Sequence, residues 1–457
     1  MSALPQVQPF SRRGVCPALS APMQTGDGLL SRVAFTDSLS PTDLDRLGDL
    51  ARRHGNGRLD VTARGSLQFR GLTAESAVEL EHDVLALQLP LRQGLAVETS
   101  PLAGMDGSEV ANPVPILELI SQKARALGLD TKLAAKMSVI VDGGGLVPMG
   151  GLLADIRLKA VRRDGDVLWL LMLGGTEEKS LLAGAVRTED AADCVIDLLI
   201  QLAERGPDAR GRDLDRAAAH NVCGDRSLPI PSEVRPPPRD IGTFSQTDER
   251  RLWPLNDNLY AAVIAPAFGQ ITSEALSALC KIASDLGVRS IRSGPSHGLY
   301  ALGRRDVCAA LLDYAQKAGL IVSDNDPRTA IAVCAGAPSC ASAYSPVRAL
   351  AAFAAKECGT MLDGSFNLHL SGCGKGCAHP APALLAFSGT SDGFSFGYQA
   401  KASASPDARL TIDQQKAGLS RLARLYEKEH KPGENARTFF VRLGKDRVVA
   451  ALRQDKR

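Results

Sequence analysis

The order of apolar and polar positions along the chain repeats itself. The first copy predicts a strand, a helix, two paired strands and a second helix. In chain order, these expected elements are residues 29–35, 41–55, 58–62, 67–71 and 75–87. Ser40 and Pro41 predict where the first helix begins, because serine caps a first helical turn and proline fits its first position. The apolar stripe of that helix is Leu44, Leu47, Leu50 and Ala51.

A second copy follows at an offset of about 230 residues. Its expected elements are residues 259–264, 272–287, 290–292, 298–302 and 304–318. Thr272 caps the first helix of this copy and Gly287 ends it. Each copy is therefore half of a ferredoxin-like sandwich. Because one amphipathic layer must bury its apolar face against another, the two halves are expected to complete one sheet about a pseudo-twofold axis.

The segments that follow the two halves also correspond to each other. Residues 136–145 and 367–376 both predict a strand that runs into a glycine-rich turn, and a charged amphipathic helix is expected over 408–428. The fold class is therefore α+β, with two ferredoxin-like half-domains and two α/β domains. The expected divisions are 10–90 and 91–226 for the first half, 227–241 for a proline-rich linker, and 242–320 and 321–457 for the second half.

The length and net charge of the chain limit its domain organisation and its possible partners. A chain of 457 residues is too long for one compact core, and a formal net charge of +2 gives no global field for nucleic acid or a membrane surface. No apolar stretch approaches the about 18 residues that a membrane span needs. Arg12 and Arg13 lack the apolar region of an export signal, so a cytoplasmic protein is expected.

Four cysteines form two short clips, Cys334-x5-Cys340 and Cys373-x3-Cys377. Glycines 372, 374 and 376 alternate with the second pair, which lets the backbone approach closely and direct N–H groups at sulfur. Four thiolates in two clips suit a cubane [4Fe–4S] cluster, which takes four cysteine ligands. These four cysteines are therefore the predicted metal ligands.

Other interpretations of the cysteines stay open. Structural zinc usually takes a Cys-x2–4-Cys knuckle, which fits the second clip but not the first. Disulfides are disfavoured in a reducing compartment. Ordinary buried thiols are the expectation for the other cysteines, which show no paired spacing: Cys16, Cys194, Cys223, Cys280, Cys308 and Cys358.

With these motifs, the chain resembles the sulfite and nitrite reductase superfamily over nearly its whole length. The resemblance implies that the four cysteines hold the cluster and that Cys377 takes the position that bridges it to sirohaem iron. Residues 62–71 are similar to the family's Thr-Thr-Arg-Gln-x-x-Gln strand pair, so Arg64 is expected to reach the anion and tetrapyrrole site. Lys136 matches an active-site lysine and is, with Arg64, a predicted catalytic residue.

The chain departs from the reductases at two active-site cations. Leu95 stands where the family has an arginine, and Ser138 where it has a second lysine. Oxyanion reduction needs clustered cations to bind the anion and feed protons. The losses weaken the interpretation as a sirohaem-dependent sulfite or nitrite reductase, which remains the alternative.

One branch fits these changes, and the chain resembles it: the precorrin-3B synthases of aerobic cobalamin biosynthesis. The opening Arg12-Arg-Gly-Val-Cys-Pro17 and the signature over 369–380 carry the likeness. It implies an iron–sulfur monooxygenase that hydroxylates precorrin-3A at C20 with oxygen from O₂ and forms a γ-lactone from the ring-A acetate. The electrons derive from NADH. It also implies a [4Fe–4S] cluster and a mononuclear non-haem iron in place of sirohaem.

A substrate rimmed with acetates and propionates predicts a pocket with guanidinium and ammonium groups. The expected substrate-binding residues are Arg64, Gln68, Arg70, Lys136, Arg13 and Arg292. Gln68 either binds a carboxylate or fills the strand pair. Lys375 either offsets the negative charge of the cluster or faces solvent.

Two parts of the chemistry lack a legible motif. His369 and His379 flank the cysteine loop, yet no two-histidine, one-carboxylate pattern for an iron appears nearby, and substrate nitrogens could serve instead. The glycine-rich turns do not form Gly-x-Gly-x-x-Gly between a strand and a helix. We therefore expect a separate reductase to deliver the electrons.

Overall fold

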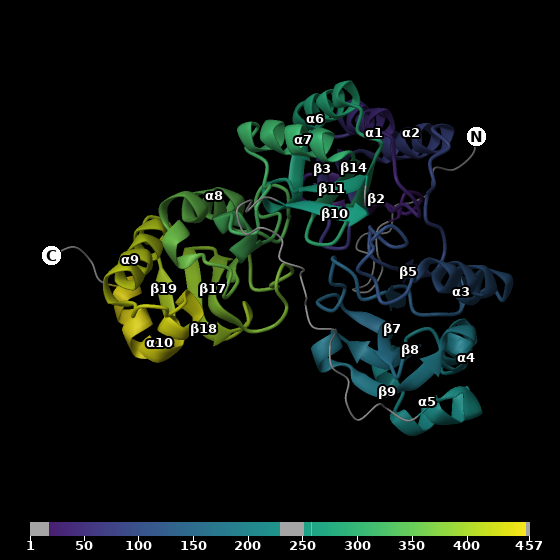
Figure 1. Cartoon of the computed structure of the whole chain (residues 1–457). Coiled ribbons are helices and arrows are strands. Elements are labelled where there is room, and N and C mark those ends of the chain that lie inside the picture. The colour runs from purple at the N-terminus through teal and green to yellow at the C-terminus, as the bar shows by residue number, and fades with distance from the viewer. Residues whose placement is uncertain (1–17, 229–250, 257, 454–457) are drawn as a thin grey trace, which may run out of the picture.

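The computed structural model describes residues 18–228, 251–256 and 258–453. Two ferredoxin-like half-domains lie together, and two α/β domains extend from them as separate lobes (Figure 1). Arg12, Arg13, Cys16 and most of the proline-rich segment lie outside the described residues. No helix within the described ranges has both the length and the apolar character that crossing a bilayer requires.

The first half-domain confirms the expected order of elements. Its sheet has the order β1-β2-β4-β3-β12. The strands are β1 (Met23–Thr25), β2 (Gly28–Val33), β3 (Arg58–Val61), β4 (Leu67–Leu72) and β12 (Gln270–Thr272), and the helices are α1 (Pro41–His54) and α2 (Ala74–Ala86). The Ser40 side chain accepts a hydrogen bond from the Asp43 N–H and so begins α1 where the sequence predicts.

The second half-domain repeats this arrangement in a sheet of order β10-β11-β14-β13. Its elements are β10 (Leu252–Asn256), β11 (Leu259–Ile264), β13 (Ser290–Gly294), β14 (Gly298–Gly303), α6 (Ser273–Leu286) and α7 (Arg305–Lys317). Gly287 ends α6 with φ of 80°, a left-handed conformation that favours glycine.

The expectation of one continuous sheet is wrong. The half-domains keep two sheets, joined where β12 pairs with β3 and where Leu39 bridges Ile291. Continuity comes from the core, because α1 packs on α6 and one apolar cluster draws side chains from both halves. Helix packing buries the apolar faces, so the short β3–β12 ladder is enough to connect the two sheets.

The first α/β domain has a sheet of order β5-β6-β7-β8-β9. The first three strands are parallel and the last three antiparallel. The bounds are β5 (Ala96–Glu98), β6 (Ser138–Asp142), β7 (Ala154–Arg163), β8 (Asp166–Gly175), β9 (Leu181–Arg187), α3 (Val114–Ala126), α4 (Thr188–Glu204) and α5 (Arg216–Cys223). The glycine-rich turn after β6 is thus at the carboxyl edge of a parallel pair.

The second α/β domain has the same topology, in the order β15-β16-β17-β18-β19. Its elements are β15 (Ile331–Val333), β16 (Leu368–Ser371), β17 (Ala383–Thr390), β18 (Gly393–Ala400), β19 (Ala408–Leu410), α8 (Val347–Glu357), α9 (Gln414–Glu429) and α10 (Ala436–Arg453). The helix expected over 408–428 is therefore corrected at its start. Residues 408–410 pair with β18 and bury Ala408 and Leu410, and the helix begins only at Gln414.

Candidate metal centre

The two cysteine clips meet at one edge of the second α/β sheet. Cys334 directly follows β15, and the glycine-rich loop with Cys373 and Cys377 directly follows β16. These strands are parallel neighbours, so both clips leave the sheet at the same edge. The Gly372 N–H donates to the Cys334 Sγ at 3.2 Å. A backbone N–H directed at a cysteine sulfur is thus present, as the alternating glycines predict.

The Cys340 segment is tied to the same loop by two further contacts. The Tyr344 N–H donates to the Gly372 carbonyl at 2.8 Å, and the Lys375 Nζ donates to the Ser342 Oγ at 2.6 Å. Lys375 therefore links the two clips, a role that neither sequence interpretation of it included.

The thiols are also near enough to influence one another. Burial raises the pKa of Cys377, and the thiols of Cys334, Cys373 and Cys340 raise it further, while Lys375 opposes them. Four thiolates this close repel one another, so a bound cationic centre is what makes the ionised set favourable.

Four thiols are the donor set that a cubane iron–sulfur cluster takes, one on each iron atom. Within the part of the chain that the structure describes, no group of three His, Cys, Asp or Glu side chains is placed to hold a single metal ion. A Cβ on Gly372 would lie 2.7 Å from the Cβ of Ala343, so only glycine allows the clips to approach this closely.

The histidine pair beside the loop does not complete an iron site. His369 is fully buried on β16, and neither of its ring nitrogens has a hydrogen-bond partner in the described structure. Burial, aided by His379, lowers the pKa of His369 to about 4, so its ring is neutral at physiological pH. The two rings lie 5.5 Å apart, with no third ligand converging on them among the described residues. The described side chains around His369 and His379 therefore do not form a ligand set for a mononuclear iron.

Arg64 lies in the turn between β3 and β4, as the sequence predicts, and its side chain reaches the first α/β domain. Its Nε donates to the Glu98 Oε2 at 2.9 Å and its Nη1 donates to the Leu153 carbonyl at 2.8 Å. Arg92 donates to the other oxygen of Glu98 at 3.0 Å. Two guanidinium groups therefore share one carboxylate, and the three groups together carry a net charge of +1.

Arg157 adds a cation that sequence reasoning missed. It is buried on β7, where its Nη1 donates to the Met149 carbonyl at 3.0 Å and its Nε has no partner in the described structure. Burial lowers the pKa of Arg157, and the proximity of Arg64 lowers it further. The alternation of β7 places Arg157 on the face opposite to the core residues Ile156 and Leu158, so nothing in the sequence indicates that it is buried or that it lies near Arg64.

Arg70 and Gln68 lie on β4 and are engaged by protein groups. Arg70 is buried and donates to Asp27, Asp60 and the Ser339 carbonyl. With its side-chain amide turned so that the oxygen faces the guanidinium, Gln68 accepts from the Arg32 Nε at 3.0 Å across the β2–β4 pair. Substrate contact by either residue stays a prediction.

The other predicted residues are dispersed. Lys136 is exposed just before β6, and Arg13 lies outside the described residues. Arg292 donates to Asp37 and to the Pro101 carbonyl and lines a cavity of about 370 Å³ between the second half-domain and residues 104–105. Two residues differ from the reductase pattern. Leu95 packs against the apolar core of the first α/β domain, and Ser138 is buried at the start of β6.

The glycine-rich turn of the first α/β domain carries carboxylates where its counterpart carries cysteines. Asp142 ends β6, and Asp106 and Glu109 pack against the turn at Gly143 and Gly145. Burial and, to a smaller extent, the nearby carboxylates of Asp106 and Asp142 raise the pKa of Glu109 to about 7, against the opposing effect of the Gly104 N–H.

This shift predicts a pH dependence of stability. A carboxyl whose pKa is higher in the folded state stabilises the fold most below its ordinary pKa of 4.5, and that contribution is lost as the pH rises through about 7. We expect Glu109→Gln to raise the free energy of unfolding at pH 8 by on the order of 2 kcal/mol. At pH 5 the two proteins should be nearly equal. Urea titrations at both pH values measure this, and equal gains at both would contradict it.

The chain is similar to known proteins in both sequence and fold. The family described as the nitrite/sulfite reductase ferredoxin-like half domain matches residues 22–87. A precorrin-3B synthase of Sinorhizobium sp is 37% identical over 445 residues, which cover 97% of this chain and 95% of that protein. A ferredoxin–nitrite reductase of Synechococcus elongatus is 24% identical over 158 residues, 32% of this chain and 31% of that protein. The solved structure of the Mycobacterium tuberculosis NirA protein has a TM-score of 0.69 at 18% identity and covers 92% of this chain and 84% of that one.

The duplicated half-domains and the paired α/β domains define a protein of the sulfite and nitrite reductase type. This confirms the predicted fold class. Within that class, the chain belongs to the precorrin-3B synthase family, as the full-length identity to the Sinorhizobium protein shows. It is thus an enzyme of an oxidoreductase-related family.

Proposed function

We propose that this chain catalyses the precorrin-3B synthase reaction. Precorrin-3A is hydroxylated at C20 with one oxygen atom of O₂, and the ring-A acetate closes a γ-lactone at C1. The second oxygen atom leaves as water, with two electrons that derive from NADH. The proposal is supported above all by the 37% identity, over 97% of this chain, to the precorrin-3B synthase of Sinorhizobium sp. The meeting of both cysteine clips at one sheet edge, with the Gly372 N–H on the Cys334 Sγ, supports the cluster on which the reaction depends.

Cys334, Cys340, Cys373 and Cys377 are the proposed ligands of a [4Fe–4S] cluster. When bound, such a cluster supplies single electrons, which ground-state O₂ needs because spin conservation slows its reaction with closed-shell organic molecules. Cys377 is the exposed member of the four, so it is the ligand nearest to solvent and to an incoming macrocycle. The chain offers the mononuclear iron no fitting ligand set within the described residues, so we assign it no role.

The side chains around Arg64 support a macrocyclic polycarboxylate as substrate. The net positive charge of Arg64, Arg92 and Glu98 suits one peripheral carboxylate. Leu153, whose carbonyl Arg64 binds, exposes 62% of its surface. A large apolar side chain left in water beside a cation is suited to the flat apolar face of a tetrapyrrole.

The electron donor is proposed to be a separate reductase. The glycine-rich turns carry cysteines after β16 and carboxylates after β6, and neither leads into a helix as a dinucleotide-binding turn does. NADH would then act through that partner.

Single turnover under ¹⁸O₂ tests the function. Anaerobically purified protein is reduced, mixed with precorrin-3A and exposed to labelled oxygen, and the product is analysed by mass spectrometry. We expect one ¹⁸O atom at C20 in the wild type and no product from Cys377→Ser. A product without the label, or turnover that is independent of O₂, would exclude the proposed reaction.

Sulfite or nitrite reduction is the alternative function, and it shares the cysteines. The uncharged Leu95 and Ser138 oppose it, because they remove two cations from the oxyanion site. Turnover of sulfite or nitrite by the same reduced protein, together with intense porphyrinoid absorption bands, would favour the reductase. A broad visible shoulder that bleaches on reduction, without such bands, is the result expected for the cobalamin-pathway oxygenase.

A further inference from the structure

We propose that the β1–β2 turn and Arg70 of the first half-domain hold the Cys340 clip in place for the cluster. Arg70, Gly26 and Asp27 are thereby positioning residues for a metal ligand that lies more than 260 residues away in the sequence. This inference rests on the four-cysteine cluster of the proposed function. It adds that the cluster site is incomplete without the opposite half of the repeat.

The Cys340 segment has little regular structure to hold it. It lies in the connection between β15 and α8, where no strand ladder fixes the backbone. The other three cysteines directly follow strands or lie in the tight loop after β16. A ligand carried on such a connection needs contacts from elsewhere if its sulfur is to stay within reach of a cluster.

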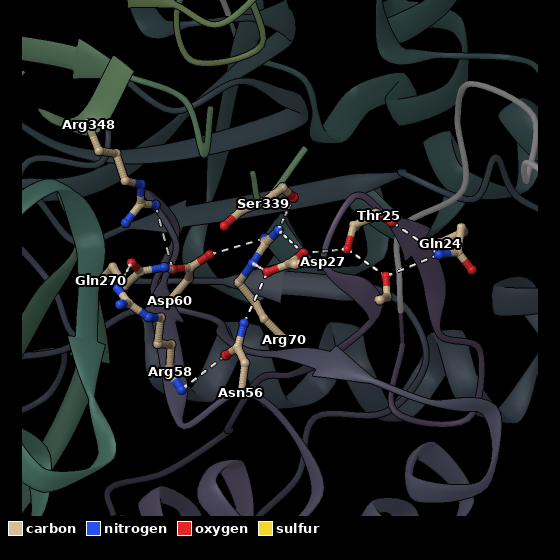
Figure 2. Close-up of polar contacts among 11 residues, drawn as sticks. Gln24, Thr25, Asp27, Asn56, Arg58, Asp60, Arg70, Gln270, Ser339 and Arg348 are labelled. Atoms are coloured by element: carbon tan, nitrogen blue, oxygen red, sulfur yellow. Dashed lines mark hydrogen bonds and ion pairs between the residues drawn. The ribbon is translucent and has the colours of Figure 1, made fainter. Parts of the chain in front are cut away.

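Arg70 supplies one such contact. From β4, its Nη2 donates to the Ser339 carbonyl at 2.7 Å, one residue before Cys340. The same guanidinium is fixed by Asp27, which accepts from the Arg70 Nε at 3.1 Å and from the Nη2 at 2.8 Å, and by Asp60 at 3.3 Å from the Nη1 (Figure 2). The planar donors of arginine thus bind two carboxylates and a backbone carbonyl at once, which lysine cannot do.

The ion pairs around Arg70 are themselves held in place. Thr25 donates to the Asp27 Oδ1 at 2.8 Å and Asn56 donates to the Asp27 Oδ2 at 3.1 Å. Asp60 accepts from Gln270 at 2.8 Å, and Arg348 at the start of α8 lies 3.6 Å from it (Figure 2). The network therefore joins β1, β3, β4 and β12 to the segment that carries Cys340, at Ser339 and at the start of α8.

The β1–β2 turn supplies a second contact, which is steric. A Cβ on Gly26 would lie 2.3 Å from the Ala341 N, 2.5 Å from the Cys340 C and 2.9 Å from the Cys340 Cα. These are backbone atoms, which cannot rotate away as a side chain does. Glycine is required here by the close approach of two backbones, and any larger residue must push the turn and the Cys340 segment apart.

The proposal is tested with two variants and matched controls. Gly26→Ala is paired with Gly151→Ala, because an added Cβ at Gly151 meets nothing within 4 Å. Arg70→Lys is paired with Arg46→Lys, an exposed arginine of α1 that forms an ion pair with Asp43. Iron and acid-labile sulfide are measured per chain after anaerobic reconstitution. The electron paramagnetic resonance spectrum of the reduced cluster and its loss to a chelator are then compared, together with thermal unfolding of the cluster-free proteins.

We expect Gly26→Ala to lose most of its iron and sulfide while the cluster-free protein unfolds within a few degrees of the wild type. Arg70→Lys should retain a cluster with an altered resonance spectrum that a chelator removes about tenfold faster, as expected for loss of a hydrogen bond from a charged donor. Both controls should match the wild type.

Wild-type cluster content, spectrum and chelator resistance in both variants would overturn the proposal. If Gly26→Ala does not fold, Arg70→Lys decides the question, because its spectrum and chelator resistance are read in folded protein. A wild type without iron and sulfide contradicts the proposed function itself. A wild type with a cluster and variants identical to it contradicts only the positioning role.

Discussion

Cys377→Ser is expected to lose the iron–sulfur cluster and, with it, at least about 100-fold in turnover. Serine replaces a soft thiolate by a poorly ionised hydroxyl, which is a weak ligand for the iron of a cluster. Cys377 is exposed, so the substitution removes no core packing. The variant should therefore fold normally, which separates loss of the cluster from loss of structure.

The measurements are iron and sulfide per chain, the visible spectrum and the ¹⁸O₂ turnover described above. Cys223→Ser is the matched control, because Cys223 is buried on α5 of the other α/β domain. Its thiol interacts with Cys194, and a serine hydroxyl can keep that contact. The control should retain iron, sulfide and activity. An unchanged spectrum in purified Cys377→Ser would show that this residue is not a ligand.

Arg64→Ala is expected to lower kcat/KM for precorrin-3A by about 30-fold, mainly through KM. The estimate is the cost of removing one charged donor from a carboxylate, on the order of 2 kcal/mol. Steady-state kinetics at saturating O₂ measure it, and Arg46→Lys on the outer face of α1 serves as the neutral control.

Glu98→Gln is the complementary variant. Glu98 now balances part of the charge of Arg64 and Arg92, so an amide in its place frees both guanidinium groups for the substrate. KM should fall, and it should rise more steeply with added salt than in the wild type. If both variants shift KM in the same direction, the charge near Arg64 is structural and does not bind the substrate carboxylate.

Much of the fold is legible from local patterns. Ser40 and Thr272 begin their helices because the capping hydrogen bond lies within three residues, and Gly287 ends α6 for the same local reason. For residues 408–410 the local pattern gave the wrong element, because their apolar alternation is too short to distinguish a strand from a helical turn. Pairing with β18 decides their conformation.

In the candidate site, too, some features could be predicted from local sequence and others could not. The spacing of the four cysteines indicates a shared ligand set, and the parallel strands β15 and β16 bring the clips together. By contrast, Arg92, Arg157 and Asp27 carry no motif, and their importance follows only from what they contact. Arg70 was expected at a substrate, and the structure shows it between two carboxylates and the Ser339 carbonyl.

The sequence by itself determined the duplication, the bounds of most helices and strands in the half-domains, and the identity of the clustered thiols. These follow from interactions between residues close in the chain, or from residue types whose chemistry is independent of position. Only the tertiary structure decided that the half-domains keep separate sheets and that a turn at Gly26 packs against Cys340. Such contacts depend on the relative placement of distant segments, which the whole set of packed faces fixes at once and no local pattern encodes.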